Sequence, residues 1–226
     1  MDNVRPPVHA LVPVKSLTES KLRLANLLTP AERARLTLTM LEDVLGNLAA
    51  TPEISRVAVV SRDPDVLDLA TGQNARVFSD PEPPKPGGDG LNDALMFAAK
   101  QLGDASALMV VPADVPLVCP ADYGAALDSW QGGVSAVRAQ DGGTNGLLSL
   151  GADAMPYRFG GDSLEHHRAA ARALELPFHI IENAVWSRDI DSPDDLIWLA
   201  EHNDQCASAE FAAQMLSAKN ILKRSA

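Results

Sequence analysis

The stretch Ala107–Pro116 reads Ala-Leu-Met-Val-Val-Pro-Ala-Asp-Val-Pro and is the clearest indication of fold class in the chain. Its apolar run Leu108–Val111 is typical of a strand that is buried on both faces of a parallel sheet. Pro112 ends the run, because proline cannot donate to a central strand ladder. Asp114 follows at once, so we expect its carboxylate just beyond the carboxyl end of a central strand, where open α/β sheets bind ligands.

Asp114 has two interpretations. It is either a Mg²⁺ ligand beside a nucleotide, or a residue without a ligand, in a turn or at the N-cap of the next helix. The stretch itself favours neither, so the rest of the chain has to distinguish a binding site from a turn.

Further apolar runs alternate with segments of helical periodicity along the chain. The expected strands, besides the central one, are 9–14, 57–60, 75–78, 134–137, 147–150 and 178–181. The expected helices are 30–50, 64–71, 90–102, 120–130, 164–174, one beginning at Pro193, and 206–222. Their expected N-caps include Thr29, Asp63, Ser192, and either Asp162 or Ser163. This alternation predicts a three-layer, Rossmann-like α/β fold with a mostly parallel mixed sheet.

Composition narrows the class of partner. With 30 acidic and 19 basic residues the chain carries a net charge of −11, which disfavours nucleic acid and anionic membranes. The apolar run near the N-terminus is too short for a membrane span or a secretory leader. Cys119 and Cys206 have neither metal-ligand spacing nor the pattern of a disulfide framework, and they fit a reducing cytoplasm.

A cationic loop follows the first expected strand. Lys15, Lys21 and Arg23 lie within nine residues of an otherwise acidic chain. We expect this loop to hold phosphate at the strand end, although a solvated loop is the plainer interpretation. The glycine fingerprints of P-loops and of dinucleotide-binding turns are absent, so phosphate contact here would depend on side chains.

Two segments before the central strand have open interpretations. Residues 80–90 contain four prolines and three glycines, and we expect a loop folded over a ligand rather than a domain linker. Gly90-Leu91-Asn92 then opens a helix. Asn92 either caps this helix or reads the edge of a base with its amide, which offers both a donor and an acceptor.

The C-terminal half adds further candidates. The glycine-rich segment Gln140–Gly146 is expected to form a hairpin turn, with an anion site as the alternative. His166 and His167 have no partner at metal-ligand spacing, and we expect them on the surface. Asp189 and Asp191 share one face of an extended segment and precede the cap of the next helix, so capping does not explain them. With Asp114 and the cationic loop, they suggest Mg²⁺ bound with a nucleoside triphosphate.

These motifs, taken in order, resemble the guanylyltransferases of coenzyme F420 biosynthesis, the CofC/FbiD enzymes with the MobA-like (GT-A/MobA-like) nucleotidyltransferase fold. The likeness runs from Val8 to Ala200. The motifs that carry it are Val12–Lys15 with Lys21–Ala25, Gly90–Asn92, Pro112–Pro116, Gly143–Asn145, Phe159-Gly160 with Ser163, and Asp189–Leu196.

The resemblance implies a role for each motif. Asp114 and Asp191 would hold Mg²⁺, with Asp189 as the alternative to Asp191. The other implied roles are binding of the triphosphate by Lys15, Lys21 and Arg23, proximity of Gly90, Leu91 and Asn92 to the guanine of GTP, and binding of a phosphorylated acid by Thr144, Gly160 and Ser163.

The implied reaction is transfer of a guanylyl group from GTP to 2-phospho-L-lactate, phosphoenolpyruvate or 3-phospho-D-glycerate, with release of pyrophosphate. The product would pass to a downstream transferase. A phosphate oxygen is already ionised at neutral pH, since the second pKa of phosphate is roughly 6, so no general base is needed. The residues do not rank the three acids.

Two rival interpretations stay open. One is another enzyme of this fold, such as a molybdenum-cofactor nucleotidyltransferase or a metal-dependent glycosyltransferase, which normally has an Asp-x-Asp pair where this chain has Asp114 alone. The other is a non-catalytic nucleotide-binding module. We expect one nucleotidyltransferase domain over residues 1–205 and a helical extension over 206–226, which has no catalytic role. The acidic surface and the apolar C-terminal helix permit a homodimer.

Overall fold

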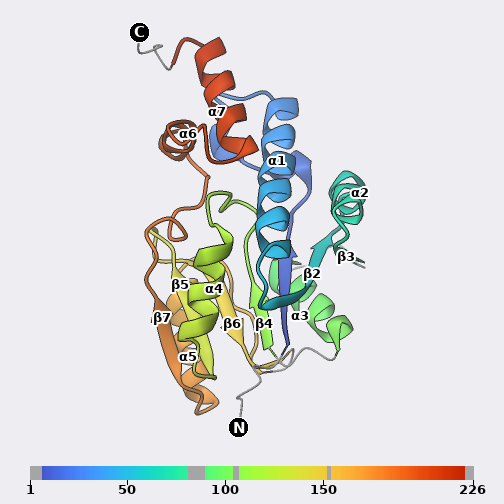
Figure 1. Ribbon diagram of the computed structural model, residues 1–226, viewed down its shortest axis with the longest axis vertical. Coiled ribbons are helices and arrows are strands. Elements are labelled where there is room, and N and C mark those ends of the chain that lie inside the picture. The colour runs from blue at the N-terminus through green and yellow to red at the C-terminus, as the bar shows by residue number, and fades with distance from the viewer. Residues whose placement is uncertain (1–6, 81–89, 104–106, 152–153, 222–226) are drawn as a thin grey trace.

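A computed structural model describes residues 7–80, 90–103, 107–151 and 154–221. In this part of the chain seven strands form one mixed sheet, in the order β3-β2-β1-β4-β6-β5-β7 (Figure 1). The strands are β1 (Val8–Pro13), β2 (Ile54–Ser61), β3 (Arg76–Ser79), β4 (Ala107–Val110), β5 (Val134–Arg138), β6 (Thr144–Ser149) and β7 (Phe178–Ile181). Only β6 runs antiparallel to its neighbours β4 and β5, so the predicted mostly parallel mixed sheet is confirmed.

Helices cover both faces of the sheet and complete the predicted three layers (Figure 1). The α-helices are α1 (Pro30–Ala49), α2 (Pro64–Gly72), α3 (Gly90–Leu102), α4 (Pro120–Ser129), α5 (Ser163–Ala173), α6 (Pro193–Ala200) and α7 (Ala207–Ala218). Helices α1, α2 and α4 contribute to the core on one face, and α3 and α5 to the core on the other.

The central strand β4 is buried on both sides, as its continuous apolar sequence predicts. Ala107 and Met109 pack into the core beneath α1 and α4, while Leu108 and Val110 pack into the core beneath α3 and α5. All four are at most 1% exposed. This two-sided burial fixes the strand at the centre of the sheet, and therefore fixes the position of the segment that leaves its carboxyl end.

Helix caps follow the sequence chemistry closely. Thr29 and Ser192 each form a complete capping box, and Asp63 accepts from the Asp65 N–H. Helix α5 begins after Asp162, one of its two expected N-caps, but without the expected side-chain bond. Asp162 occupies its N-cap with φ 53° and makes no side-chain cap bond, while the Ser163 hydroxyl bonds elsewhere.

The start of one strand also differs from the prediction. Strand β6 begins at Thr144 rather than Leu147, because Thr144 pairs with Arg138 of β5 and extends the ladder into the glycine-rich segment. The segment is a hairpin connection, as expected, and Asp141 accepts from the Gly143 N–H within it. The prolines and glycines of 81–89 lie outside the described residues, so the expectation of a loop over a ligand stays a prediction.

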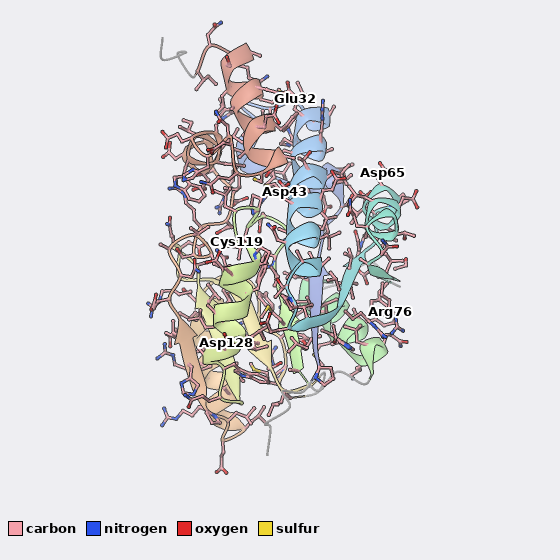
Figure 2. All side chains as sticks on the ribbon, viewed as in Figure 1. Glu32, Asp43, Asp65, Arg76, Cys119 and Asp128 are labelled. Atoms are coloured by element: carbon pink, nitrogen blue, oxygen red, sulfur yellow. The ribbon has the colours of Figure 1, made fainter. Side chains whose placement is uncertain are left out.

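The C-terminal helix α7 packs along α1 and α6 in a third apolar cluster. Glu32 and Asp43, both labelled in Figure 2, hold it to α1 at its two ends. Asp43 accepts from the N–H groups of Ala207 and Ser208 at 3.2 and 2.8 Å. A negative charge is stabilising there, because the N-terminus of a helix carries a partial positive charge. Glu32 pairs with Lys219 at 3.1 Å. None of the described helices is long and apolar enough to cross a membrane.

Candidate active site

Asp114 and Asp191, the two predicted metal ligands, both face the ammonium group of Lys21. Lys21 donates from Nζ to Asp114 Oδ2 at 2.5 Å, and the same Nζ lies 3.8 Å from Asp191 Oδ1. Arg23 donates to the other oxygen of Asp191 at 2.8 Å. Residues from three distant parts of the sequence are thus brought together at the end of the central strand.

The cationic loop has a defined backbone. It contains two short 3-10 turns, Leu17–Glu19 and Leu22–Leu24, with Lys21 between them in the left-handed conformation at φ 50°. A lysine pays a steric cost of roughly 1–2 kcal/mol in this conformation, and such strain is concentrated at functional sites. The backbone here turns the Lys21 side chain toward Asp114, leaving that side chain only 8% exposed.

Side chains from two helices hold this loop in place. Asp63 Oδ2 accepts from the Leu17 N–H at 2.9 Å and from the Ser16 hydroxyl at 3.2 Å, besides its role as the α2 cap. Arg33, buried at 6% exposure, donates to the Ser20 and Leu28 carbonyl oxygens. The loop is therefore preorganised, and less entropy remains to be lost when an anion binds there.

A backbone hydrogen bond joins the two acidic segments. The Ile190 N–H donates to the Asp114 carbonyl oxygen at 2.9 Å, and Ile190 is fully buried. The capping box of Ser192 and Asp195 fixes the next residues, and Arg188 donates to Asp195 at 2.9 Å. These contacts fix the backbone on either side of Asp191.

Asp189 faces inward beside this pair. Its Oδ1 accepts from Asn145 Nδ2 at 3.2 Å, and burial raises its pKa above the ordinary aspartate value, with the nearby Asp114 carboxylate raising it further. Asn145 also bonds the Trp186 carbonyl oxygen through the same amide. Asn145 is part of the motif Gly143–Asn145, but the sequence analysis predicts no role for it. Its partner Asp189 is 44 positions away, so the pair is not visible in the sequence.

Two adjoining cavities open beside the aspartates. The larger, about 420 Å³, contains Lys15, Lys21, Arg23, Asp114 and Asp191 in its wall. Its apolar wall includes Met40, Leu91 and Phe159. The smaller, about 280 Å³, includes Ser61, Arg62, Asp80, Gly90 and Gly160. Lys15, Leu91 and Phe159 line both, so the two cavities form one continuous groove.

Asn92 lies in the first turn of α3, and its side-chain amide bonds both the carbonyl oxygen and the N–H of Phe159. Its Nδ2 donates to the Phe159 carbonyl oxygen at 3.0 Å, and its Oδ1 accepts from the Phe159 N–H at 2.8 Å. In this arrangement the amide bonds protein backbone with both of its polar atoms. Asn92 therefore positions a wall of the groove, a role that neither sequence interpretation included.

Thr144, Ser163 and His167 form a buried chain of hydrogen bonds. Ser163 Oγ donates to Thr144 Oγ1 at 3.1 Å, and His167 Nδ1 lies 3.1 Å from the same oxygen. The three residues are 6%, 1% and 0% exposed. They lie outside the walls of the two cavities described above, whereas Gly160 lines the smaller one.

The surface placement of His167 was wrong, while His166 is exposed as expected. Ser163, His167 and Ala171 recur every four residues and occupy the inward face of α5. This spacing was visible in the sequence and would have predicted burial. Burial in turn lowers the pKa of His167 to about 4, with the neighbouring His166 and Arg158 adding to the effect.

The carboxylate pair fits a magnesium ion. Asp114 and Asp191 already face one positive charge, and Mg²⁺ in proteins takes one or two carboxylates with substrate phosphates and water. Within the described ranges, no group of three or more His, Cys, Asp or Glu side chains is arranged as a complete metal site.

Comparison with known proteins gives a consistent family. Residues 8–222 match the family model described as "Guanylyl transferase CofC like". A phosphoenolpyruvate guanylyltransferase of Roseiflexus sp. (strain RS-1) is 40% identical over 214 residues, 94% of this chain and 93% of the relative. A 2-phospho-L-lactate guanylyltransferase of Methanothermobacter thermautotrophicus is 31% identical over 207 residues, 91% of this chain and 90% of the relative.

Solved structures agree on the fold. A nucleotidyl transferase from Methanothermobacter thermautotrophicus superposes with a TM-score of 0.63 at 18% identity, covering 87% of this chain and 97% of its own. A crystal structure of a protein from Desulfovibrio desulfuricans G20 gives a TM-score of 0.76 at 16% identity, covering 96% of this chain and 99% of its own. The chain belongs to the CofC-like guanylyl transferase family and is a nucleotidyltransferase.

Proposed function

We propose that this enzyme transfers a guanylyl group from GTP to a phosphorylated three-carbon acid, in a Mg²⁺-dependent reaction of coenzyme F420 biosynthesis. The observation that carries the proposal is the convergence of Asp114 and Asp191 on Lys21, in the wall of a cavity of about 420 Å³. Carboxylates paired with cations at the carboxyl ends of central strands suit a metal-bound triphosphate.

The triphosphate would lie along the cationic loop. Lys15 lines both cavities, so its ammonium can reach phosphate oxygens, and Lys21 and Arg23 flank the carboxylates. Arg23 can bind phosphate with two parallel hydrogen bonds. Gly90 and Leu91 then lie beside the guanosine, and Asn92 supports that wall through Phe159.

The chemistry requires little covalent help from the protein. A phosphate oxygen of the acid, already ionised, attacks the α-phosphorus of GTP, the bond to the β-phosphate bridging oxygen breaks, and pyrophosphate leaves. Lys15 and Lys21 offset the charge that grows on pyrophosphate, and positioning supplies much of the rate. Mg²⁺ held by Asp114 and Asp191, with Asp189 as the alternative to Asp191, would neutralise phosphate charge when bound.

The acceptor would bind near Gly160, which lines the smaller cavity, and near Thr144 and Ser163, which are buried beside it. Ser163 donates its N–H to the Gly160 carbonyl oxygen at 3.2 Å and its hydroxyl to Thr144. Phosphoenolpyruvate, 2-phospho-L-lactate and 3-phospho-D-glycerate share one carboxylate and one phosphate on three carbons, so one anion site can accept any of them. The names of relatives support the first two acids. The guanylylated product is an activated phosphate, which a downstream transferase would consume.

A pyrophosphate-release assay tests the proposal. GTP, ATP and CTP are each combined with each of the three acids, with and without Mg²⁺. We expect release only with GTP, Mg²⁺ and at least one acid, and a product with the mass of the guanylylated acid. Equal release with ATP, or none with any acid, would contradict the proposal.

A further inference from the structure

His167 lies where three segments of the acceptor region meet. Its Nδ1 is 3.1 Å from Thr144 Oγ1 on β6, and its Nε2 accepts from the Arg158 N–H at 3.0 Å. Its ring also packs edge-on against Phe159, with centroids 4.8 Å apart. The imidazole therefore joins β6, α5 and the segment that carries the shared wall of the two cavities.

The backbone partner determines which ring nitrogen carries the proton. A backbone N–H can only donate, so Nε2 must be the unprotonated nitrogen of His167. In the neutral ring the proton then lies on Nδ1, which donates to Thr144 Oγ1. Complete burial of His167 keeps the ring neutral near pH 7.

Two accepted hydrogen bonds leave the Thr144 hydroxyl free to act only as a hydrogen-bond donor. Its hydroxyl oxygen has two lone pairs, and these accept from His167 Nδ1 and from Ser163 Oγ. Its own hydrogen is then directed away from both partners. A hydroxyl held in this way is a donor, which is what a carboxylate or phosphate oxygen requires.

We propose that His167 is a positioning residue that fixes the Thr144 hydroxyl as a hydrogen-bond donor to an anionic oxygen of the acceptor acid. Ser163 has the same effect, because its hydroxyl donates a hydrogen bond to the Thr144 oxygen. The inference rests on the proposed function, because it takes Thr144 to contact the acid.

Two amide variants separate the two nitrogens of the ring. His167→Asn places an amide nitrogen near the Nδ1 position and can still donate to Thr144. His167→Gln places an amide oxygen near the Nε2 position and can still accept from Arg158, but it loses the bond to Thr144. His166→Gln, one residue away and exposed, is the matched control. Thr144→Val removes the hydroxyl at nearly constant shape and sets the scale of the effect.

Steady-state kinetics with GTP and the best acid give the readout. We expect Thr144→Val and His167→Gln each to raise the KM of the acid about tenfold, which is the loss of about one hydrogen bond. The KM of GTP should change less than about twofold, because neither Thr144 nor His167 lines the groove that is assigned to GTP. His167→Asn and His166→Gln should stay close to wild type. A merely structural role for His167 would alter both KM values and would not be rescued by Asn.

The outcomes distinguish the inference from the proposed function. An unchanged acid KM in His167→Gln, when Thr144→Val raises it, overturns the role of His167 and leaves the proposed function intact. An unchanged acid KM in Thr144→Val overturns both the inference and the acceptor assignment. A protein that transfers guanylyl to none of the acids refutes the proposed function.

A second measurement needs no activity. Long-range ¹H–¹⁵N correlation spectra of wild type and His167→Asn assign the His167 ring nitrogens. We expect the neutral form with the proton on Nδ1 at pH 7. The form with the proton on Nε2, or a charged ring, would overturn the inference whatever the kinetics of the variants.

Discussion

Lys21 Nζ lies 2.5 Å from Asp114 Oδ2, although the two residues are 93 positions apart. The lysine side chain is 8% exposed and the aspartate side chain 26%, so the pair is partly shielded from water. Asp191 faces the same ammonium at 3.8 Å. A single cation thus stands where the proposed function requires Mg²⁺ to bind, and the two cations are expected to compete.

That competition gives the first prediction. In Lys21→Met the carboxylates of Asp114 and Asp191 lose the ammonium that they share, while Arg23 still pairs with Asp191, so Mg²⁺ alone should stabilise this variant more than wild type. At a concentration about tenfold above the dissociation constant, binding stabilises by about 1.4 kcal/mol, a rise in Tm of a few degrees. Thermal unfolding with and without MgCl₂ measures the difference. Lys100→Met, on the exposed side of α3, is the control, and identical Mg²⁺ responses in all three proteins would count against the metal assignment.

Lys15 gives the second prediction. Lys15→Ala should weaken GTP binding about tenfold, since a charge-assisted hydrogen bond to phosphate contributes roughly 1.5–3 kcal/mol. Lys100→Ala should bind like wild type. Isothermal titration calorimetry measures both, and wild-type affinity in Lys15→Ala would exclude Lys15 from the phosphate site.

The third prediction concerns stability and pH. The pKa of His167 is lowered to about 4 in the folded protein, mainly by burial, from an ordinary value of 6.5. The unfolded chain therefore takes up a proton below pH 6.5 that the folded chain resists, and stability falls as pH drops from 6.5 toward 4. The contribution lost is about 3 kcal/mol. Urea unfolding of wild type and His167→Asn at pH 7 and 4.5 measures this contribution. All other groups titrate in both proteins, so the difference between the two losses of stability belongs to His167. Parallel losses in the two proteins would show that His167 is not the cause.

A fourth prediction tests the packing of Gly146, the residue after Asn145, against Trp186. A Cβ at Gly146 would lie 2.8 Å from Trp186 Cζ2 and 3.0 Å from Val137 Cγ2. Trp186 is 1% exposed and cannot move aside freely, so Gly146→Ala should cost about 1–3 kcal/mol. Gly46→Ala meets nothing within 4 Å on α1 and should instead stabilise by up to about 1 kcal/mol. Denaturant unfolding measures both, and equal effects would contradict the packing argument.

The sequence predicts the fold well because its signals are local. Two-sided burial of β4, the capping boxes at Thr29 and Ser192, and the alternation of strands with helices all depend on neighbouring residues. The general place of the site also follows from local pattern, since the carboxyl ends of parallel strands share one edge of the sheet.

Specific partners could not be predicted in the same way. Lys21 with Asp114 and Asn92 with Phe159 are pairs separated by 93 and 67 positions, and only the folded chain selects them. The start of β6 at Thr144 likewise depends on pairing with β5, which overrides the turn character of the glycines. His167 is different, because its helical spacing was sufficient to predict burial.

The proposed reaction depends most on Asp114 and Asp191 as catalytic groups. Asp114→Asn and Asp191→Asn keep the side-chain shape and remove the charge, so both should retain a wild-type fold. Asp65→Asn, exposed on α2 and labelled in Figure 2, is the matched control.

The most direct measurement is the rate of pyrophosphate release from GTP in the presence of the accepted acid and saturating Mg²⁺. We expect Asp114→Asn and Asp191→Asn to lower kcat at least about 100-fold, the scale of losing one major electrostatic contact in a transition state, and Asp65→Asn to match wild type. Wild-type rates in a folded Asp114→Asn protein would contradict the central claim.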